Sequence, residues 1–584
     1  MLLNSYFMAM VVVEESKIRY NHVGYGINLP KRFLLAVPKN SADCASVNKI
    51  SGARFVIVGE SGTLAFEGKL TPRSFCDYTD EFVYDGDFSA LEIPGKYKIK
   101  VFYPCAESGT VCVSSKFFEI SNEWLLKQLK ANIKSFYYQR TGEALPVEFA
   151  GKWARPAAHL DDSIAFHAIM NREGLWNAHG GWYDAGDYGK YIVNGGVSVG
   201  SLLLACEMCA GLDCNFKPSF EQPDRLLDEL RFELEFFLRM QDADGGVFFK
   251  VTPGHWDGFM MPQDSDVMQK RYVMGKSTTS TLNFAGALAQ AHRVFSKTGE
   301  VADKEFAARC FNASLRAYQW ALANPNADWP HNTEGSGGYG DEHVADEFFW
   351  ARAMLYRELR DGAENTVGLN ISDLRNSLIG DMRSNPAEFG LSWRDTQNFG
   401  WIALALSCDG CKNGEDSALG DAARAELERM STEIVKLHQA DAYGLSIRKF
   451  IWGSNGDIAN HALTLLVAYR WSRNPQFLET AVELVNFIYG RNPVNTSFVT
   501  GSAWSSPMHP HHRICHADGV EDPIPGLLVG GINSDRQDMH RMPHYPGDLP
   551  GFSYTDERCS FASNETAINW NSPLTSLLAL LSRF

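Results

Sequence analysis

The stretch Ser121-Asn122-Glu123-Trp124-Leu125-Leu126 separates two kinds of periodicity in the chain. Ser121 and Asn122 have side chains typical of a helix N-cap, and Leu125 and Leu129 fall on one face of the helix that would follow. Short β-prone runs precede this stretch, and long helical patterns follow it. The sequence therefore predicts a domain boundary after residue 121.

The segment before this boundary has the pattern of an all-β domain. Runs such as 32–37, 54–58 and 97–101 are rich in β-branched and aromatic residues, and glycine-containing turn signals separate them. About a hundred residues of this kind favour an immunoglobulin-like β-sandwich over 18–121, preceded by an extension over 1–17. We find no catalytic constellation here and expect a scaffold or lid that packs on the next domain.

The segment 122–584 has the pattern of a helical domain. Long amphipathic stretches alternate with loops rich in Gly and Asp, without convincing strands between them. This favours an all-α toroid of paired helices, with the chemistry in loops at one end. The clearest predicted helices cover 223–240, 278–295, 306–323, 346–359, 401–408, 422–438, 458–471 and 476–489.

Composition narrows the choice of partner. The 584-residue chain has a net charge of −16, and its aromatic fraction of 12% includes 14 Trp. Nucleic acids and anionic membranes are disfavoured as partners, because both select basic surfaces. Residues 1–13 are apolar but lack the basic n-region and cleavage site of a signal peptide, so we expect a cytoplasmic protein. The oligomeric state stays open.

Two sequence patterns resemble metal sites. The spacing of Cys206-x2-Cys209 and Cys408-x2-Cys411 fits zinc, but the first pair lies in an apolar run and is better explained as buried core. Residues 242–245 resemble the start of an EF-hand loop, yet Pro253 stands where the closing Glu should be. We therefore expect no required cofactor and no metal at the catalytic site. Structural calcium is conceivable but not indicated.

The loop Gly181-Trp182-Tyr183-Asp184-Ala185-Gly186-Asp187-Tyr188 carries a pair of carboxylates three residues apart. In a turn rich in glycine, Asp184 and Asp187 can both point at one small volume. Paired carboxylates can hold and deprotonate a water molecule. A calcium loop or a helix cap remains an alternative on this pattern alone.

A second stretch, from Tyr554 to Ser572, holds the single carboxylate Glu565 between amides and aromatic rings. A shielded carboxyl can keep its proton near neutral pH, as a general acid must. If Asn564 capped a helix, the helix dipole would lower the pKa of Glu565 and oppose this role. A helix that starts at Ser572-Pro573 would leave Glu565 in the preceding loop.

Both stretches resemble glycoside hydrolase family 9, also called cellulase family E. The Asp184–Asp187 loop is similar to the family's nucleophilic-water loop. The second stretch matches the family's second active-site signature at Tyr554, Asp556, Phe561, Glu565, Ala567, Asn571 and Ser572. The opening Asn21-His22-Val23-Gly24-Tyr25 resembles the immunoglobulin-like domain that precedes many members. The resemblance covers nearly the whole chain.

The resemblance implies an (α/α)6 barrel and an inverting hydrolase. Asp187 would be the general base, Asp184 would help to position the water, and Glu565 would be the general acid. His511 and Arg513, in the family's Pro-His-x-Arg segment, would bind sugar near the cleavage point. Ala503 and Ser505 depart from the family pattern there, which puts the substrate in doubt rather than the catalysis. We name as further substrate-binding candidates Trp182, Tyr183, Trp504, Tyr554, Asp556 and Asn564.

The substrate is an oligosaccharide on this hypothesis. We expect exo action on short β-1,4-linked cello- or glucosamine-oligosaccharides, with the loops 256–273 and 515–551 blocking one end of the cleft. Asp548, Asp556 or Glu557 would bind the amine of glucosamine. An endo-β-1,4-glucanase is the alternative within the family. A non-catalytic carbohydrate-binding protein is the alternative of another class, and the presence of all three carboxylates argues against it.

Overall fold

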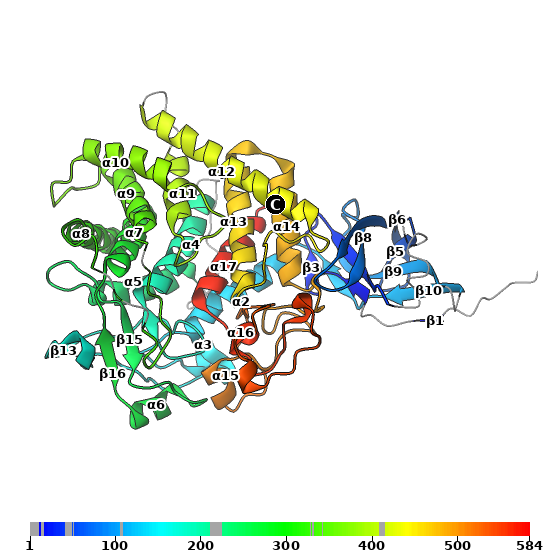
Figure 1. Ribbon diagram of the computed structural model, residues 1–584, viewed down its shortest axis with the longest axis horizontal. Helices are drawn as coiled ribbons and strands as arrows, with labels where there is room; N and C mark the ends of the chain where they lie inside the picture. The colour runs from blue at the N-terminus through cyan, green and yellow to red at the C-terminus, as the bar shows by residue number, and fades with distance from the viewer. Residues whose placement is uncertain are drawn as a thin grey trace, which may run out of the picture.

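The computed structural model describes residues 11–12, 17–40, 50, 52–105, 109–210, 225–327, 329, 332–341, 343–407 and 415–584. A small β-domain lies at one end of a larger helical domain (Figure 1). The last β-domain strand, β11 (Phe118–Ile120), ends just before helix α2 (Glu123–Tyr138) begins. The change of periodicity therefore marks the junction between the two folds.

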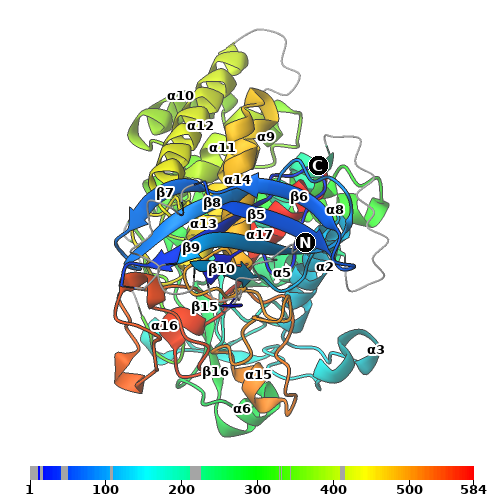
Figure 2. The same ribbon diagram turned by 90° about the vertical axis from the view of Figure 1, so that its right-hand side faces the viewer.

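The β-domain is a sandwich of two sheets, as predicted, and its strands cross in front of the helices in Figure 2. Alternate residues of facing strands, such as Phe33, Phe55 and Ile99, are fully buried between the sheets. One sheet has the order β2 (Ile18–Arg19), β4 (Arg32–Pro38), β8 (Glu81–Asp87), β7 (Thr71–Cys76). The other contains β1 (Val11–Val12), β3 (Gly24–Tyr25), β5 (Arg54–Gly59), β6 (Leu64–Lys69), β9 (Gly95–Cys105), β10 (Gly109–Ser114) and β11.

The helical domain is an (α/α)6 barrel in which largely buried inner helices pack against amphipathic outer ones. The inner helices are α4 (Ile192–Ala210), α7 (Thr278–Phe295), α9 (Ala345–Arg360), α11 (Gln397–Ser407), α13 (Ser454–Ser472) and α17 (Ile568–Leu581). The outer helices are α2, α5 (Leu226–Met240), α8 (Val301–Ala323), α10 (Ile371–Ser384), α12 (Glu415–Ala440) and α14 (Pro475–Ile488).

The eight helices predicted from periodicity all exist; α7 has the predicted bounds, and the other seven differ at one or both ends. The expectation that no strands lie between the helices is wrong. A five-stranded sheet runs in the order β13 (Leu175–Trp176), β12 (Ile164–Phe166), β16 (Arg271–Met274), β15 (Lys250–Pro253), β14 (Lys190–Tyr191). Its strands are two to four residues long, too short for an alternating pattern to be recognised.

Helix α4 is the one described helix that is long and apolar enough to cross a membrane by length and composition alone. Its most apolar window, Ile192–Cys209, is 89% buried inside the protein. A core helix of a barrel passes the same test, and the packing of α4 against α7 and α17 explains its composition.

Buried polar contacts join the two domains. The Asn21 amide donates to Asn486 Oδ1 at 2.9 Å, and the Tyr443 hydroxyl donates to Glu81 Oε2 at 2.5 Å. The Gly551 backbone N–H donates to the Tyr78 carbonyl at 2.8 Å. The last contact ties the β-domain to the loop that leads into the Tyr554–Ser572 stretch, so the β-domain supports one side of the candidate site.

Candidate active site

The loop that carries Asp184 and Asp187 is buried, and two glycines make its path possible. Gly181 has φ +84°, and a Cβ there would lie 2.6 Å from the Phe236 ring. At Gly186, a Cβ would lie 2.0 Å from the His511 carbonyl oxygen. The second glycine therefore lets the carboxylate loop touch the His511 segment, which lies more than three hundred residues away in sequence.

Asp184 is held at both carboxylate oxygens. The Asn194 amide donates to Oδ1 and the Tyr339 hydroxyl donates to Oδ2, each at 2.5 Å. Burial, reinforced by the negative charge of Asp187, raises the pKa of Asp184 to about 7. The sequence did not predict Asn194 as a site residue, because it lies on helix α4 and only the fold brings it under the loop.

Asp187 is less constrained than Asp184, although it is also buried. Among the described residues, the hydrogen bond recorded for its carboxylate is a long one, 3.4 Å from the Gly189 N–H to Oδ2. A carboxylate with few protein donors keeps lone pairs for another partner. This arrangement suits the predicted base, which must accept a proton from water, with Asp184 fixed beside it.

Glu565 follows the short helix α16 (Phe561–Asn564) in extended conformation, with φ −72° and ψ 154°. Burial raises the pKa of Glu565 well above its usual range, and the charges of Asp187 and Asp184 add to this effect. Arg513 and a hydrogen bond from Trp452 act in the opposite direction. A carboxyl in this setting keeps its proton near neutral pH, as a general acid requires.

The next helix does not begin where the sequence suggested. Helix α17 starts at Ile568 with Ala567 as its N-cap, so Pro573 lies inside the helix, and neither Asn564 nor Ser572, the two starts considered from the sequence, is the cap. Buried contacts along α17 outweigh the hydrogen bond that Pro573 cannot donate. Glu565 still lies outside the helix, and Asn564 does not cap it.

His511 and Arg513 lie beside both carboxylate segments. His511 pairs with Glu565 in a parallel β-bridge, and its Nδ1–H donates to the Arg558 carbonyl at 2.5 Å. Burial lowers the pKa of His511 to about 4, so the ring is neutral and its Nε2 is an acceptor. Arg513 donates to the Gly186 carbonyl from its backbone N–H and from Nη1, both at 3.0 Å. Arg513 therefore holds the Asp187 loop as well as facing Glu565.

The structure corrects the predicted sugar-stacking aromatics. Trp182 and Tyr183 are each 1% exposed, and Tyr554 is 4% exposed, so none offers an open ring face. Trp182 packs on Phe136 within the barrel core. Local sequence gives the aromatic character of these residues, but their burial depends on neighbours that are distant in sequence.

Trp504 is exposed but lies at the domain junction. Its ring stacks on His22 at a centroid distance of 4.8 Å, and the Lys116 ammonium lies 3.6 Å from the ring centroid. Both partners belong to the β-domain. Trp504 therefore joins the two domains, and its role in binding substrate stays a prediction.

Asp556 and Asn564 form an internal frame instead of a sugar contact. Asp556 accepts the backbone N–H groups of Met508 and His509, at 2.7 and 2.9 Å. Asn564 donates to the His509 carbonyl and accepts the Tyr554 hydroxyl. These bonds use the polar atoms that a sugar would need, so both side chains shape the loop before His511.

Two other aromatics present open faces near the site. Trp256 is 53% exposed, and the Arg513 guanidinium lies 5.9 Å from its ring centroid. Trp452 is 40% exposed and donates a hydrogen bond to Glu565. Their exposed rings lie beside Arg513 and Glu565, which the sequence alone does not show.

Ion pairing and core packing account for the sequence patterns that resemble metal sites. Lys276 forms ion pairs with both Asp242 and Asp244, at 2.7 and 3.0 Å, so a lysine occupies the place of a cation. Cys206 and Cys209 lie in the core helix α4. Cys408 and Cys411 fall outside the described residues. Within the described ranges, no group of three or more His, Cys, Asp or Glu side chains is arranged to hold a metal ion.

Comparisons with known proteins agree with this geometry. Residues 127–578 match the model of glycosyl hydrolase family 9, and residues 13–103 match that of the cellulase N-terminal ig-like domain. The chain is 34% identical to a xyloglucan-specific endo-beta-1,4-glucanase of Bacteroides ovatus, over 98% of this chain and 94% of the relative. It is 30% identical to a cellodextrinase of Butyrivibrio fibrisolvens, over 96% and 99%. The solved structure of a thermostable endoglucanase from Alicyclobacillus acidocaldarius aligns with a TM-score of 0.82 at 28% identity, over 97% and 100%.

Proposed function

Because the chain belongs to glycosyl hydrolase family 9, we propose that it is an endo-β-1,4-glucanase that cleaves internal bonds of β-1,4-linked glucans. The chain is an inverting glycoside hydrolase with an aspartate base and a glutamate acid. What we propose beyond this activity is that the enzyme cleaves internal bonds and that its substrate is built from glucose.

In the proposed mechanism, Asp187 takes a proton from a water molecule that Asp184 helps to orient. The water attacks the anomeric carbon while Glu565 gives its proton to the leaving oxygen. Attack from the face opposite the leaving group inverts the anomeric configuration. The two roles need opposite protonation states, and the raised pKa of Glu565 supplies the protonated partner.

The observation that carries internal cleavage is the pair of exposed tryptophans. Trp256 and Trp452 come from separate loops. The Arg513 guanidinium lies over the Trp256 ring, and Trp452 donates a hydrogen bond to Glu565. Pyranose rings stack on open indole faces. A chain that contacts both tryptophans extends beyond a single sugar unit, which suits a polymer.

Exo action and its glucosamine variant have less support. The relatives described above include enzymes named as endoglucanases. Two of the carboxylates suggested for an amine are already engaged, since Asp556 accepts backbone N–H groups and Glu557 pairs with His544. Cleavage of short cello-oligomers, as the name cellodextrinase states for one relative, is the second candidate.

Product analysis tests the proposal. The purified protein would be incubated with carboxymethylcellulose, xyloglucan, cellohexaose and chitosan oligomers. An endoglucanase lowers the viscosity of the polymers early and releases oligomers of mixed length, with an inverted anomer at the new reducing end. Release of single sugars from one end of cellohexaose, with no loss of polymer viscosity, would instead support exo action. Activity confined to chitosan oligomers would instead support a substrate built from glucosamine.

A further inference from the structure

Gln139 lies directly after helix α2, between the two segments that carry the catalytic carboxylates, and its side chain is buried. Its Nε2 donates to the Ala185 carbonyl at 3.0 Å, and its Oε1 lies 3.0 Å from His512 Nε2. One amide therefore contacts the Asp184–Asp187 loop on one side and the His511–Arg513 segment on the other.

The direction of these hydrogen bonds is determined by their partners. The Cys515 backbone N–H donates to His512 Nδ1 at 3.3 Å, so the ring proton of His512 is on Nε2. Burial lowers the pKa of His512 to about 3, so the ring stays neutral. His512 Nε2–H must then donate to Gln139 Oε1, which leaves the Gln139 NH2 group for the Ala185 carbonyl.

We propose that Gln139 is a positioning residue that sets the placement of the base Asp187 relative to the acid Glu565. Ala185 lies between Asp184 and Asp187. On the other side, the residue before His512 pairs with Glu565 in the β-bridge. The proposal rests on the glycoside hydrolase function given above and assigns this function a residue that does not touch the substrate.

Backbone contacts secure the carbonyls on either side of Ala185. The Asp184 carbonyl accepts the Ile568 N–H at 2.8 Å, and the Gly186 carbonyl accepts the Arg513 N–H at 3.0 Å. Neither of these main-chain bonds involves the Gln139 side chain. The Gln139 bond to Ala185 is carried by a side chain, so it can be removed while the neighbouring connections remain.

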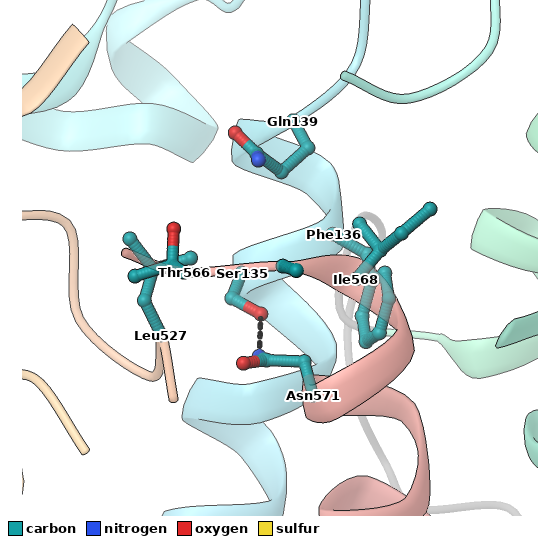
Figure 3. Close-up of a pocket in the computed structure, with 8 residues that line it drawn as sticks. Ser135, Phe136, Gln139, Leu527, Thr566, Ile568 and Asn571 are labelled. Atoms are coloured by element: carbon teal, nitrogen blue, oxygen red, sulfur yellow. Dashed lines mark hydrogen bonds between the residues drawn. The ribbon is translucent and has the colours of Figure 1, made fainter. Parts of the chain in front are cut away.

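A small cavity adjoins Gln139, lined also by Phe136, Leu527 and Thr566 (Figure 3). It has room for about one water molecule. Packing on this side of the amide is therefore not tight. The hydrogen bonds to Ala185 and His512, more than van der Waals contact, hold the Gln139 side chain in place.

The first test replaces Gln139 by leucine, which keeps the volume but removes both hydrogen bonds. We expect kcat on cellohexaose to fall about 10–100-fold with KM within about twofold, because misplacing reacting groups slows the chemical step. Gln241→Leu is the matched control. Gln241 is also buried directly after a helix, α5. It donates to the carbonyls of Gly245 and Ala313, neither of which belongs to the segments that carry Asp184, Asp187 and Glu565.

A second variant, Gln139→Glu, gives a signature that a structural role would not. Its side chain accepts from His512 but can donate to Ala185 only when protonated. The ratio of its kcat to that of the wild type should therefore rise as the pH is lowered from about 8 to about 5. If the new carboxylate of this variant acted only through its negative charge on Asp187, it would raise the pKa of the base. The ratio would then fall as the pH is lowered.

The outcomes separate the two proposals. A wild-type protein without activity on any β-1,4-glucan refutes the proposed function. An active wild type in which Gln139→Leu loses no more kcat than Gln241→Leu refutes the positioning role alone. A Gln139→Glu ratio that stays constant or falls at low pH also refutes it, and this measurement decides between the outcomes if the leucine variant does not fold.

Discussion

At the scale of single residues, the site depends on carboxyl groups of similar chemistry in different surroundings. Asp184 accepts two side-chain hydrogen bonds, Asp187 accepts a weak one, and the partly buried Glu565 lies near both. Mutual repulsion and burial keep Glu565 protonated. The roles of acid and base therefore follow from the environment of each carboxyl rather than from its residue type.

Asp187→Ala should lower kcat on cellohexaose by about three orders of magnitude or more, because the attacking water loses its base. Added azide should restore part of the rate on an aryl cellobioside, since a small anion needs no deprotonation. Asp244→Ala, at an exposed carboxylate paired with Lys276, is the control and should keep the wild-type rate. Near-full activity of the Asp187→Ala variant would show that another residue is the general base.

Glu565→Gln should stabilise the protein at neutral pH. The folded pKa of Glu565 is raised, so the folded state keeps a proton that the unfolded chain releases above pH ~4.5. The wild type therefore loses stability as the pH rises from the unfolded towards the folded pKa, and glutamine removes this loss. We therefore expect a higher melting temperature for Glu565→Gln than for the wild type at pH 7.

Thermal unfolding at about pH 4 and pH 7 measures this effect. The gain from Glu565→Gln should disappear at the lower pH, where the glutamate is protonated in both states. Asp244→Asn should show the opposite sign. Burial opposes the shift at Asp244, but the hydrogen bond from Lys276 lowers its pKa, so this carboxylate stabilises at neutral pH. Equal melting temperatures of wild type and Glu565→Gln at pH 7 would contradict the raised pKa.

At the scale of elements, the site is an assembly of loops that the barrel holds in register. Helix α4 supplies Asn194, the start of α17 donates to the Asp184 carbonyl, and the strand-like His511 segment pairs with Glu565. At Gly186 the base loop lies against the His511 segment, with no room for a side chain. A single missing side chain therefore determines how near the base loop comes to the acid segment.

Gly186→Ala tests this approach. The added Cβ would lie 2.0 Å from the His511 carbonyl oxygen, so the loop and the His511 segment must separate. We expect kcat to fall at least about tenfold, together with a lower melting temperature. Gly380→Ala in α10 is the control, since a Cβ there meets nothing within 4 Å beyond the neighbouring backbone of its own helix, and it should be neutral or stabilising by about 0.5–1 kcal/mol. Unchanged kcat in Gly186→Ala would show that the loop tolerates the separation.

At the scale of the whole molecule, the β-domain is part of the architecture of the site. It contacts the barrel through buried polar groups, and the Tyr78 carbonyl holds Gly551 in the loop before Tyr554. The stacked pair of His22 and Trp504 closes the junction near the segment that leads to His511. The β-domain therefore helps to hold barrel loops near the site in place.

Trp504→Ala should lower the melting temperature while leaving KM for cellohexaose within about twofold of the wild type. The physical reason is that the Trp504 ring contacts His22 and Lys116 of the β-domain rather than a sugar. Trp256→Ala is the contrasting variant and should raise KM, because its ring is exposed beside Arg513 and stacking on a sugar is worth about 1 kcal/mol. A raised KM in Trp504→Ala with an unchanged melting temperature would show that Trp504 binds substrate.

Much of the architecture follows from local patterns in the sequence. The switch of period at Ser121, the long amphipathic helices and the two carboxylate motifs are all readable over a few turns of chain. The short strands β12 to β16 and the true start of α17 are not readable in this way. Their formation depends on contacts with partners distant in sequence, which override local propensity.

By itself, the sequence determined the two-domain order and the three carboxylates, because periodicity and motif spacing are properties of neighbouring residues, and the resemblance of its motifs indicated the family. Only the tertiary structure decided that Trp182 and Tyr554 are buried, that Trp504 joins the domains, and that Asn194 and Gln139 support the carboxylates. Burial, pKa and hydrogen-bond partners depend on segments that folding brings together. The protonated state of Glu565 belongs to this second group, because it arises from low solvation and from the charges of Asp184 and Asp187.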